Sequence, residues 1–206
     1  MKIVLASSNE HKVKEINAIV HSFPLLEERV GVRCQDKANP SIEFILPPDG
    51  FDPIEDGMTF EENSYIKAHA AWELSKTWSL ADDSGLCIDA LNGEPGIYSA
   101  RYAETPTKRI ERVLKELEGV ENRTAHFECA MTLINPEGEI AFACKGICEG
   151  SIITETRGTH GFGYDPIFLL KNSDKTIAEL PDDEKNKISH RSKALTQVLE
   201  FINSIL

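Results

Sequence analysis

Apolar residues along the chain alternate between short continuous runs and segments with helical spacing. Residues 2–6 form an apolar run, which predicts a strand, and residues 13–20 carry apolar side chains at the spacing of one helix face. Between them, residues 7–9 are Ser, Ser and Asn, which commonly cap helices. The chain is therefore predicted to open as strand, turn and helix.

An irregular segment follows before the next predicted helix. Residues 22–57 are rich in proline and acidic side chains, with one alternating stretch at 42–46 that suits a strand. Thr59 and Glu62 have the three-residue spacing of a capping box, which predicts a helix from there to about Lys76.

A polar segment then separates two short apolar runs. The runs at 79–81 and 86–90 predict two strands, and Asp82-Asp83-Ser84-Gly85 between them is interpreted as a turn.

The second half of the chain contains clear start and turn signals. Thr105-Pro106 predicts a helix with proline at its first position. Strands are predicted at 126–134 and 139–148, around a hairpin turn at 135–138. An amphipathic helix from about Arg191 ends the sequence.

Helices and strands interleave around one hairpin, which predicts an α/β fold with a mixed, twisted sheet flanked by helices. A chain of 206 residues allows one large domain or two lobes that share a sheet. We expect a single domain across residues 1–206.

Charge and hydropathy exclude several kinds of partner. The chain has 22 Lys and Arg against 34 Asp and Glu, a net charge of −12, whereas a duplex-binding protein needs a basic face. The longest apolar run, Ile140–Cys144, is far shorter than the ~20 residues of a membrane span. The N-terminus turns polar at Ser7, too soon for a signal-peptide core. We expect a cytoplasmic protein with no nucleic-acid or membrane partner.

The cysteines are odd in number and form no CxxC motif. We interpret them as plain thiols in a reducing compartment, because free cysteine packs as a small hydrophobe. They are Cys34, Cys87, Cys129, Cys144 and Cys148.

Two segments suggest phosphate and metal chemistry. The segment after the first strand opens a helix, where backbone N–H groups and hydroxyls favour an anion, although an ordinary helix cap has the same composition. It comprises Ser7, Ser8, Asn9, Glu10, His11 and Lys12. A carboxylate of the Asp82-Asp83 pair could bind Mg²⁺ or accept a proton from water, and Glu55 could supply a second metal ligand. The alternatives are an Asp-rich turn and a solvated acidic loop.

Two further segments suggest a nucleotide base. The loop Gly161-Phe162-Gly163-Tyr164-Asp165-Pro166 could stack a base on a ring, or could be a tight turn with core aromatics. Lys185, His190, Arg191 and Lys193 gather cations against the overall charge of the chain, which suggests an anionic ligand. Surface charges beside Ser189 as a plain cap are the alternative. Together these parts are what a nucleoside triphosphate site requires.

Taken in order, the motifs resemble those of the inosine triphosphate pyrophosphatase family, from Val4 to near the C-terminus. They are Leu5-Ala6-Ser7-Ser8-Asn9-x-x-Lys12, Thr59-Phe60-x-x-Asn63-x-x-x-Lys67-Ala68, Ala81-Asp82-Asp83-Ser84-Gly85-Leu86, Gly93-x-Pro95-Gly96-Ile97-Tyr98-Ser99-Ala100-Arg101, Gly161 to Pro166, and Ile188-Ser189-His190-Arg191. Two positions depart from the family pattern: Ser8 stands where glycine is usual, and His160 where glycine is common.

The resemblance implies a two-lobed homodimer with a cleft between the lobes, and Mg²⁺-dependent hydrolysis of ITP, dITP and XTP to the monophosphate and pyrophosphate. It implies that Ser7 to Lys12 hold phosphates, that Glu55 and Asp83 serve the metal, and that Asp83 accepts a proton. It implies nucleotide contacts from Lys67, Ser84, Phe162, Gly163, Tyr164, Asp165, Lys185, His190 and Arg191. A Maf-like pyrophosphatase with another base preference and a nucleotide-binding sensor without turnover are the alternative interpretations.

Overall fold

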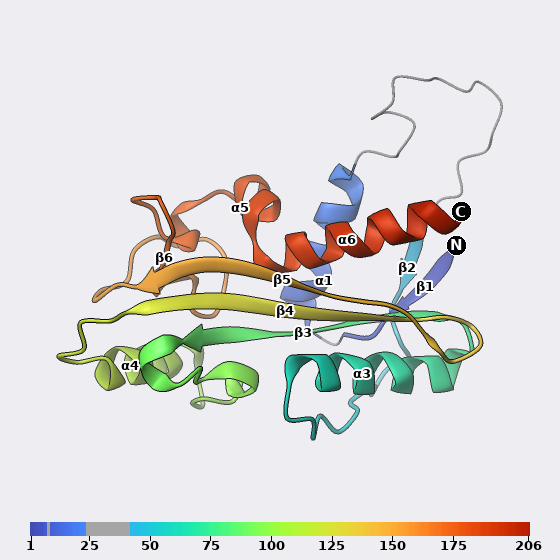
Figure 1. Cartoon of the computed structure of the whole chain (residues 1–206), viewed down its shortest axis with the longest axis horizontal. Helices are drawn as coiled ribbons and strands as arrows, with labels where there is room; N and C mark the ends of the chain where they lie inside the picture. The colour runs from blue at the N-terminus through green and yellow to red at the C-terminus, as the bar shows by residue number, and fades with distance from the viewer. Residues whose placement is uncertain (8, 24–41) are drawn as a thin grey trace. The chain divides into compact units, whose positions relative to one another are not determined.

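The structure is a computed structural model that describes residues 1–7, 9–23 and 42–206. Its strands are β1 (Lys2–Leu5), β2 (Glu43–Ile45), β3 (Trp78–Ile88), β4 (Thr124–Ile134), β5 (Ile140–Ile152) and β6 (Phe168–Leu170). Its α-helices are α1 (Glu10–Ser22), α3 (Phe60–Ser75), α4 (Pro106–Glu116), α5 (Asp182–Ile188) and α6 (His190–Ile205). The strands form one sheet in the order β2-β1-β3-β4-β5-β6 (Figure 1). Parallel pairs at β1 and an antiparallel pair at β6 make the sheet mixed, which confirms the predicted α/β fold.

The chain divides into two compact units. Unit 1 comprises residues 1–82, 130–144 and 194–206, and unit 2 comprises residues 83–129 and 145–193. The long strands β3, β4 and β5 each contribute residues to both units. The division on β3 falls between Asp82 and Asp83, so the two adjacent carboxylates belong to different units.

Unit 1 is built on β1, which pairs in parallel with β2 and with the start of β3. Figure 1 shows α3 on one side of these strands and α1 with α6 on the other. The predicted start of α3 is confirmed, because the Thr59 hydroxyl accepts from the Glu62 N–H at 3.1 Å. The helix ends where Lys76 adopts a left-handed conformation, with φ of 51°. Small side chains of α3, Ala68 and Ala71, pack closely on the sheet.

Unit 2 has its own apolar core. Val113 and Leu117, on and just after α4, pack with Phe127 and Phe168 of strands β4 and β6. The predicted start of α4 is confirmed, because the Thr105 hydroxyl accepts from the Lys108 N–H at 3.2 Å and Pro106 follows it.

The prediction of a turn at residues 82–85 is wrong, because β3 runs unbroken from Trp78 to Ile88. The sequence interpretation relied on the turn preference of Asp, Ser and Gly. In the structure the polar side chains of this segment have partners, since Asp82 pairs with Lys12 and Ser84 accepts from Arg191. Satisfied polar groups can remain buried, so the strand continues through them.

Other elements differ from prediction mainly in their extent. The hairpin strands are confirmed but extend further, and the short strand β6 and helix α5 were not predicted. Of the irregular segment 22–57, residues 24–41 lie outside the described residues, and the strand expected at 42–46 is present as β2. Across the described residues, none of the helices has the length and apolar character needed to span a membrane.

The described cysteines are free thiols, as predicted, and Cys34 lies outside the described residues. Burial raises the pKa of Cys87 and of Cys144 to about 11 each, from 9.0. A raised pKa means that the folded state keeps the thiol proton at a pH where the unfolded state has lost it. These thiols therefore add stability below about pH 9 that disappears as the pH approaches 11.

We expect the free energy of unfolding to fall between pH 9 and pH 11, by about 1 kcal/mol for each thiol after allowance for solvent screening. Cys144→Ser is the matched variant, because serine keeps a donor for the Ala194 carbonyl but does not titrate in this range. Urea unfolding at pH 8 and pH 10.5 measures the effect. Identical pH dependence in wild type and Cys144→Ser would contradict it.

Candidate functional site

The start of α1 is held by Asn9. Its side-chain Oδ1 accepts from the N–H groups of His11 and Lys12, at 3.0 and 3.3 Å, and its own N–H donates to the Ser7 hydroxyl at 3.3 Å. This is a capped helix start, the alternative left open by the sequence. Glu10 and His11 are exposed there, and Ser8 lies outside the described residues. The phosphate role of this segment stays a prediction.

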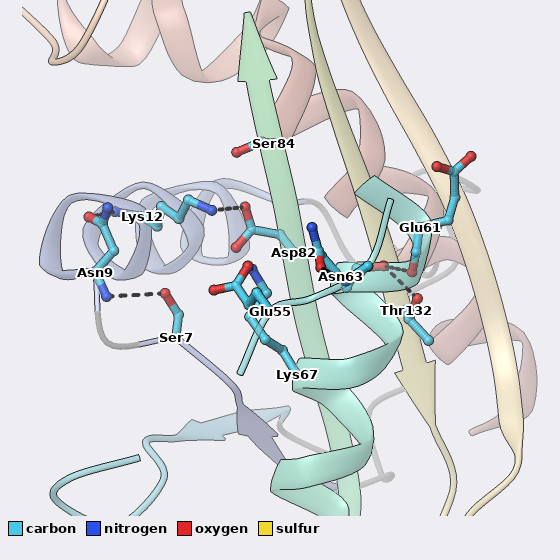
Figure 2. Close-up of polar contacts among 12 residues, drawn as sticks. Ser7, Asn9, Lys12, Glu55, Glu61, Asn63, Lys67, Asp82, Ser84 and Thr132 are labelled. Carbon is cyan, nitrogen blue, oxygen red and sulfur yellow. Dashed lines mark hydrogen bonds and ion pairs between the residues drawn. The ribbon is translucent and has the colours of Figure 1, made fainter. Parts of the chain in front are cut away.

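Lys12 points from the first turn of α1 to β3. Its Nζ lies 2.9 Å from Oδ2 of Asp82, and the two side chains are 15% and 1% exposed. Figure 2 shows this contact crossing from the helix to the strand. A carboxylate so fully removed from water requires such a partner, so the pair joins α1 to β3.

Glu55 is held by α3. Its Oε2 accepts from Nζ of Lys67 at 2.8 Å, and the Glu55 side chain remains 33% exposed. Figure 2 shows Lys12 reaching Asp82 from α1 and Lys67 reaching Glu55 from α3. We call Ser7, Asn9, Lys12, Glu55, Lys67 and Asp82 the unit 1 cluster.

Asp165 organises the loop of unit 2. Its Oδ2 accepts from the backbone N–H of Phe162 at 2.8 Å and from Nζ of Lys185 at 2.7 Å. Gly161 has a φ of +73°, and a Cβ there would lie only 2.1 Å from that same oxygen, so only glycine fits. The loop therefore closes on the Asp165 carboxylate.

Two cations lie by the ring of Phe162. The Lys185 Nζ lies 4.6 Å and the Arg191 Cζ 6.0 Å from the ring centroid. Arg191 is 1% exposed and donates from Nη2 to the Ser84 hydroxyl at 2.8 Å. These contacts bring residues from three distant parts of the sequence together. We call Ser84, Phe162, Asp165, Lys185 and Arg191 the unit 2 cluster.

Other predicted contact residues have structural surroundings of their own. His190 stacks on Phe127 with 4.9 Å between ring centroids. Tyr164 belongs to the unit 2 core, its hydroxyl donates to the Ser99 carbonyl at 2.9 Å, and burial raises its pKa to about 12. Gly163 provides a turn position, with φ of +64°. Nucleotide contacts by these three residues stay predictions.

Asp83 lies on β3 as the first residue of unit 2, and it is 8% exposed. Its adjacent residue Asp82 faces Lys12. Because successive side chains on a strand point to opposite faces, Asp83 presents its carboxylate away from that pair. Asp82 thus joins β3 to α1 through Lys12, and the catalytic role of Asp83 stays a prediction.

The carboxylates present fit Mg²⁺ by their chemistry. Glu55 and Asp83 offer the oxygen donors that a hard cation prefers. The described part of the chain contains no group of three or more His, Cys, Asp or Glu side chains placed to hold a metal. Mg²⁺ commonly takes only one or two carboxylates from a protein and its other ligands from water and substrate phosphates.

A separate hollow in unit 2 has a volume of about 610 Å³, and of the candidate residues named from the sequence only Lys193 lines it. Its lining combines apolar side chains with charges of both signs, and Glu149 there already pairs with Lys171 at 2.9 Å.

The sequence interpretation assigned no role to Asn63, although it quoted the motif that contains it. Asn63 is 1% exposed, and its Oδ1 accepts from the N–H of Gly57, two residues after Glu55. The spacing of Asn63, four residues before Lys67, was the available signal in the sequence. Positions i and i+4 share a helix face, so the spacing places both side chains on the same side of α3.

The structure is that of an α/β protein with a mixed sheet, in which lysines pair with carboxylates and two cations lie beside the ring of Phe162. A model of the Ham1 family matches residues 3–201. The chain belongs to the Ham1 family, which confirms the resemblance drawn from the motifs and disfavours the Maf-like alternative.

Individual relatives match over the whole chain. A dITP/XTP pyrophosphatase from Oceanobacillus iheyensis is 43% identical over 99% of this chain and 99% of its own. Another from Synechococcus sp. is 42% identical over 99% of this chain and 91% of its own. The structure of a HAM1 protein from Coxiella burnetii superposes with a TM-score of 0.82 at 39% identity, covering 99% of both chains.

We expect the stability of the fold to depend on both Lys185 and Asp165, because each side chain of this ion pair is only 5% exposed. Lys185→Met leaves a buried carboxylate without its cation and should lower the free energy of unfolding by about 3–5 kcal/mol. Adding Asp165→Asn should recover part of that loss, because the amide oxygen still accepts from the Phe162 N–H. Urea unfolding of the two single variants and the double variant measures the coupling. Strictly additive losses would contradict it.

Proposed function

We propose that the protein hydrolyses ITP, dITP and XTP to the nucleoside monophosphate and pyrophosphate, which clears deaminated purines from the nucleotide pool. Membership of the Ham1 family supports this, as do relatives named dITP/XTP pyrophosphatase that match the whole chain at 42–43% identity. The observation in the site that carries it is the ring of Phe162 flanked by Lys185 and Arg191.

The unit 2 cluster suits a 6-keto purine. Phe162 offers a face on which a base can stack, and both neighbouring cations are donors without an acceptor. The acceptor oxygen nearby, Oδ2 of Asp165, is already taken by the loop and Lys185. Hypoxanthine and xanthine present an acceptor at position 6, whereas adenine presents a donor. Donor facing donor would leave buried polar groups unpaired, which disfavours ATP.

The unit 1 cluster suits the triphosphate. The hydroxyl of Ser7 and the N–H groups at the start of α1 are donors, and Lys12 and Lys67 add positive charge. Glu55 and Asp83 are the carboxylates that would hold Mg²⁺, and a bound Mg²⁺ would offset the charge that develops on the leaving pyrophosphate. Asp83 would orient the attacking water and accept its proton while the anhydride bond between the α- and β-phosphates breaks. We further propose that the protein acts in the cytoplasm as a homodimer.

Release of pyrophosphate tests this function. Wild-type protein with Mg²⁺ should release pyrophosphate from ITP, dITP and XTP with a much higher kcat/KM than from ATP, GTP or UTP, and excess chelator should abolish the activity. Asp83→Asn is the matched variant, since it keeps the size of the side chain but removes the base and a metal charge. Its kcat should fall at least about 10²- to 10⁴-fold, while nucleotide binding and unfolding change little.

The outcomes separate the candidate functions. A protein that binds ITP but releases no pyrophosphate is a sensor, and near wild-type kcat in Asp83→Asn would remove the catalytic role from that residue. Full activity in excess chelator would remove the metal from the proposal.

Arg191 should contribute to base preference. Arg191→Ala removes donors that match the 6-keto group, so kcat/KM for ITP should fall more than kcat/KM for ATP, by about tenfold in their ratio. Phe162→Ala is the comparison, because stacking on a ring does not distinguish purines, and it should lower both values by similar factors. An unchanged ITP-to-ATP ratio in Arg191→Ala would mean that the base is read elsewhere.

A further inference from the structure

The segment that carries Glu55 is an irregular loop, yet it contains one of the two carboxylates that we propose to hold Mg²⁺. Its neighbours are largely in solvent: Ile54 is 81% exposed and Met58 is 77% exposed. A loop with so little of its own packing needs fixed contacts from a regular element if Glu55 is to stay in one position.

Helix α3 supplies those contacts from one face. Lys67 holds the Glu55 carboxylate at 2.8 Å, and Asn63, one turn earlier, accepts from the Gly57 N–H at 3.0 Å. The adjacent Met58 N–H donates to Oε2 of Glu62 at 2.6 Å. The loop is therefore bound to α3 at Glu55 itself and at the two positions Gly57 and Met58 that follow it. Figure 2 shows Asn63 and Lys67 on the α3 face that also meets Glu55.

Gly57 packs closely against Asn63 and Glu62 of α3. A Cβ on Gly57 would lie 2.7 Å from Oδ1 of Asn63 and 2.8 Å from Cβ of Glu62, closer than real Cβ contacts. The amide of Asn63 is also almost fully buried, with 1% of the residue exposed.

The helix that makes these contacts is itself fixed to the sheet. The Ser64 hydroxyl lies 2.8 Å from that of Thr132 on β4, in a fully buried contact. The Ser79 hydroxyl on β3 donates to the Ala68 carbonyl at 2.7 Å. Any position that α3 imposes on the loop is thereby set relative to the strands of unit 1.

We propose that Asn63 is a positioning residue for the metal-binding carboxylate: its contact with the Gly57 N–H, which we call the Gly57 clamp, holds Glu55 where it can serve Mg²⁺. This inference rests on the proposed function for the role of Glu55. Asn63 acts through the loop backbone and does not itself contact the substrate or the metal. The clamp reduces the conformations that the Glu55 loop must give up when Mg²⁺ binds, and it thereby raises the apparent affinity for Mg²⁺.

Hydrogen–deuterium exchange and Mg²⁺ dependence together test the clamp on the full chain. Asn63→Ala should speed exchange at the Gly57 and Met58 amides about tenfold, leaving α3 amides unchanged, and should raise the Mg²⁺ concentration for half-maximal ITP hydrolysis about tenfold. The kcat at saturating Mg²⁺ should stay within about threefold, because the metal itself can hold the loop once it is bound. Asn63→Asp keeps an acceptor oxygen and should restore slow exchange at Gly57.

Two further variants distinguish loss of the Gly57 clamp from a general loss of stability. Gly57→Ala pushes the loop away from the opposite side of the contact and should raise the Mg²⁺ requirement as Asn63→Ala does. Ser64→Ala weakens the attachment of α3 to β4 without touching the clamp, so it should lower the free energy of unfolding and leave the Mg²⁺ requirement unchanged.

These experiments test the positioning role of Asn63 and the proposed function separately. Unchanged exchange at Gly57 in Asn63→Ala, or a Mg²⁺ requirement that shifts equally in Ser64→Ala, would overturn the positioning role. Absence of Mg²⁺-dependent pyrophosphate release from the wild type would overturn the proposed function instead. The exchange rates at Gly57 would then still support or overturn the clamp, because they are measured without nucleotide or metal.

Discussion

A carboxylate removed from water must be matched by a cation, and Asp82 and Asp165 follow this constraint, while Glu55 is paired in the same way although its side chain is 33% exposed. The pairs are Lys12–Asp82 at 2.9 Å, Lys67–Glu55 at 2.8 Å and Lys185–Asp165 at 2.7 Å. An unpaired buried charge costs several kcal/mol, so each pair stabilises its surroundings chiefly because losing either member is costly. The pairs also determine local structure: strand β3 can pass through a polar segment, and the loop at 161–165 can close on a buried carboxylate.

The same pairing places positive charge in a protein whose net charge is −12. The three lysines are held in place by their partners rather than being mobile surface charges, and Lys12 and Lys67 lie within motifs shared with the resembled family. Fixed cations lose little side-chain entropy on binding an anion, which favours recognition of a phosphate-bearing ligand. In the proposed function, the carboxylates would therefore contribute to phosphate binding by orienting the cations.

Several motif residues make contacts that hold the motifs in shape. Asn9 caps α1, Asp165 closes the Phe162 loop, and the Tyr164 hydroxyl reaches the Ser99 carbonyl. Asn63 does the same for the loop after Glu55. A short motif thus combines residues of both kinds, and the sequence alone does not separate them because both kinds are polar and closely spaced.

The sequence by itself determined the elements whose signals are local: the capped starts of α3 and α4, the hairpin of β4 and β5, and the residue types of both clusters. These signals depend on neighbours within a few positions, which the sequence contains in full. Only the tertiary structure decided that residues 82–85 form a strand, because their partners Lys12 and Arg191 lie about 70 and about 107 positions away along the chain. The tertiary structure likewise decided which polar side chains pair with one another, because a contact between distant segments depends on how the whole chain packs.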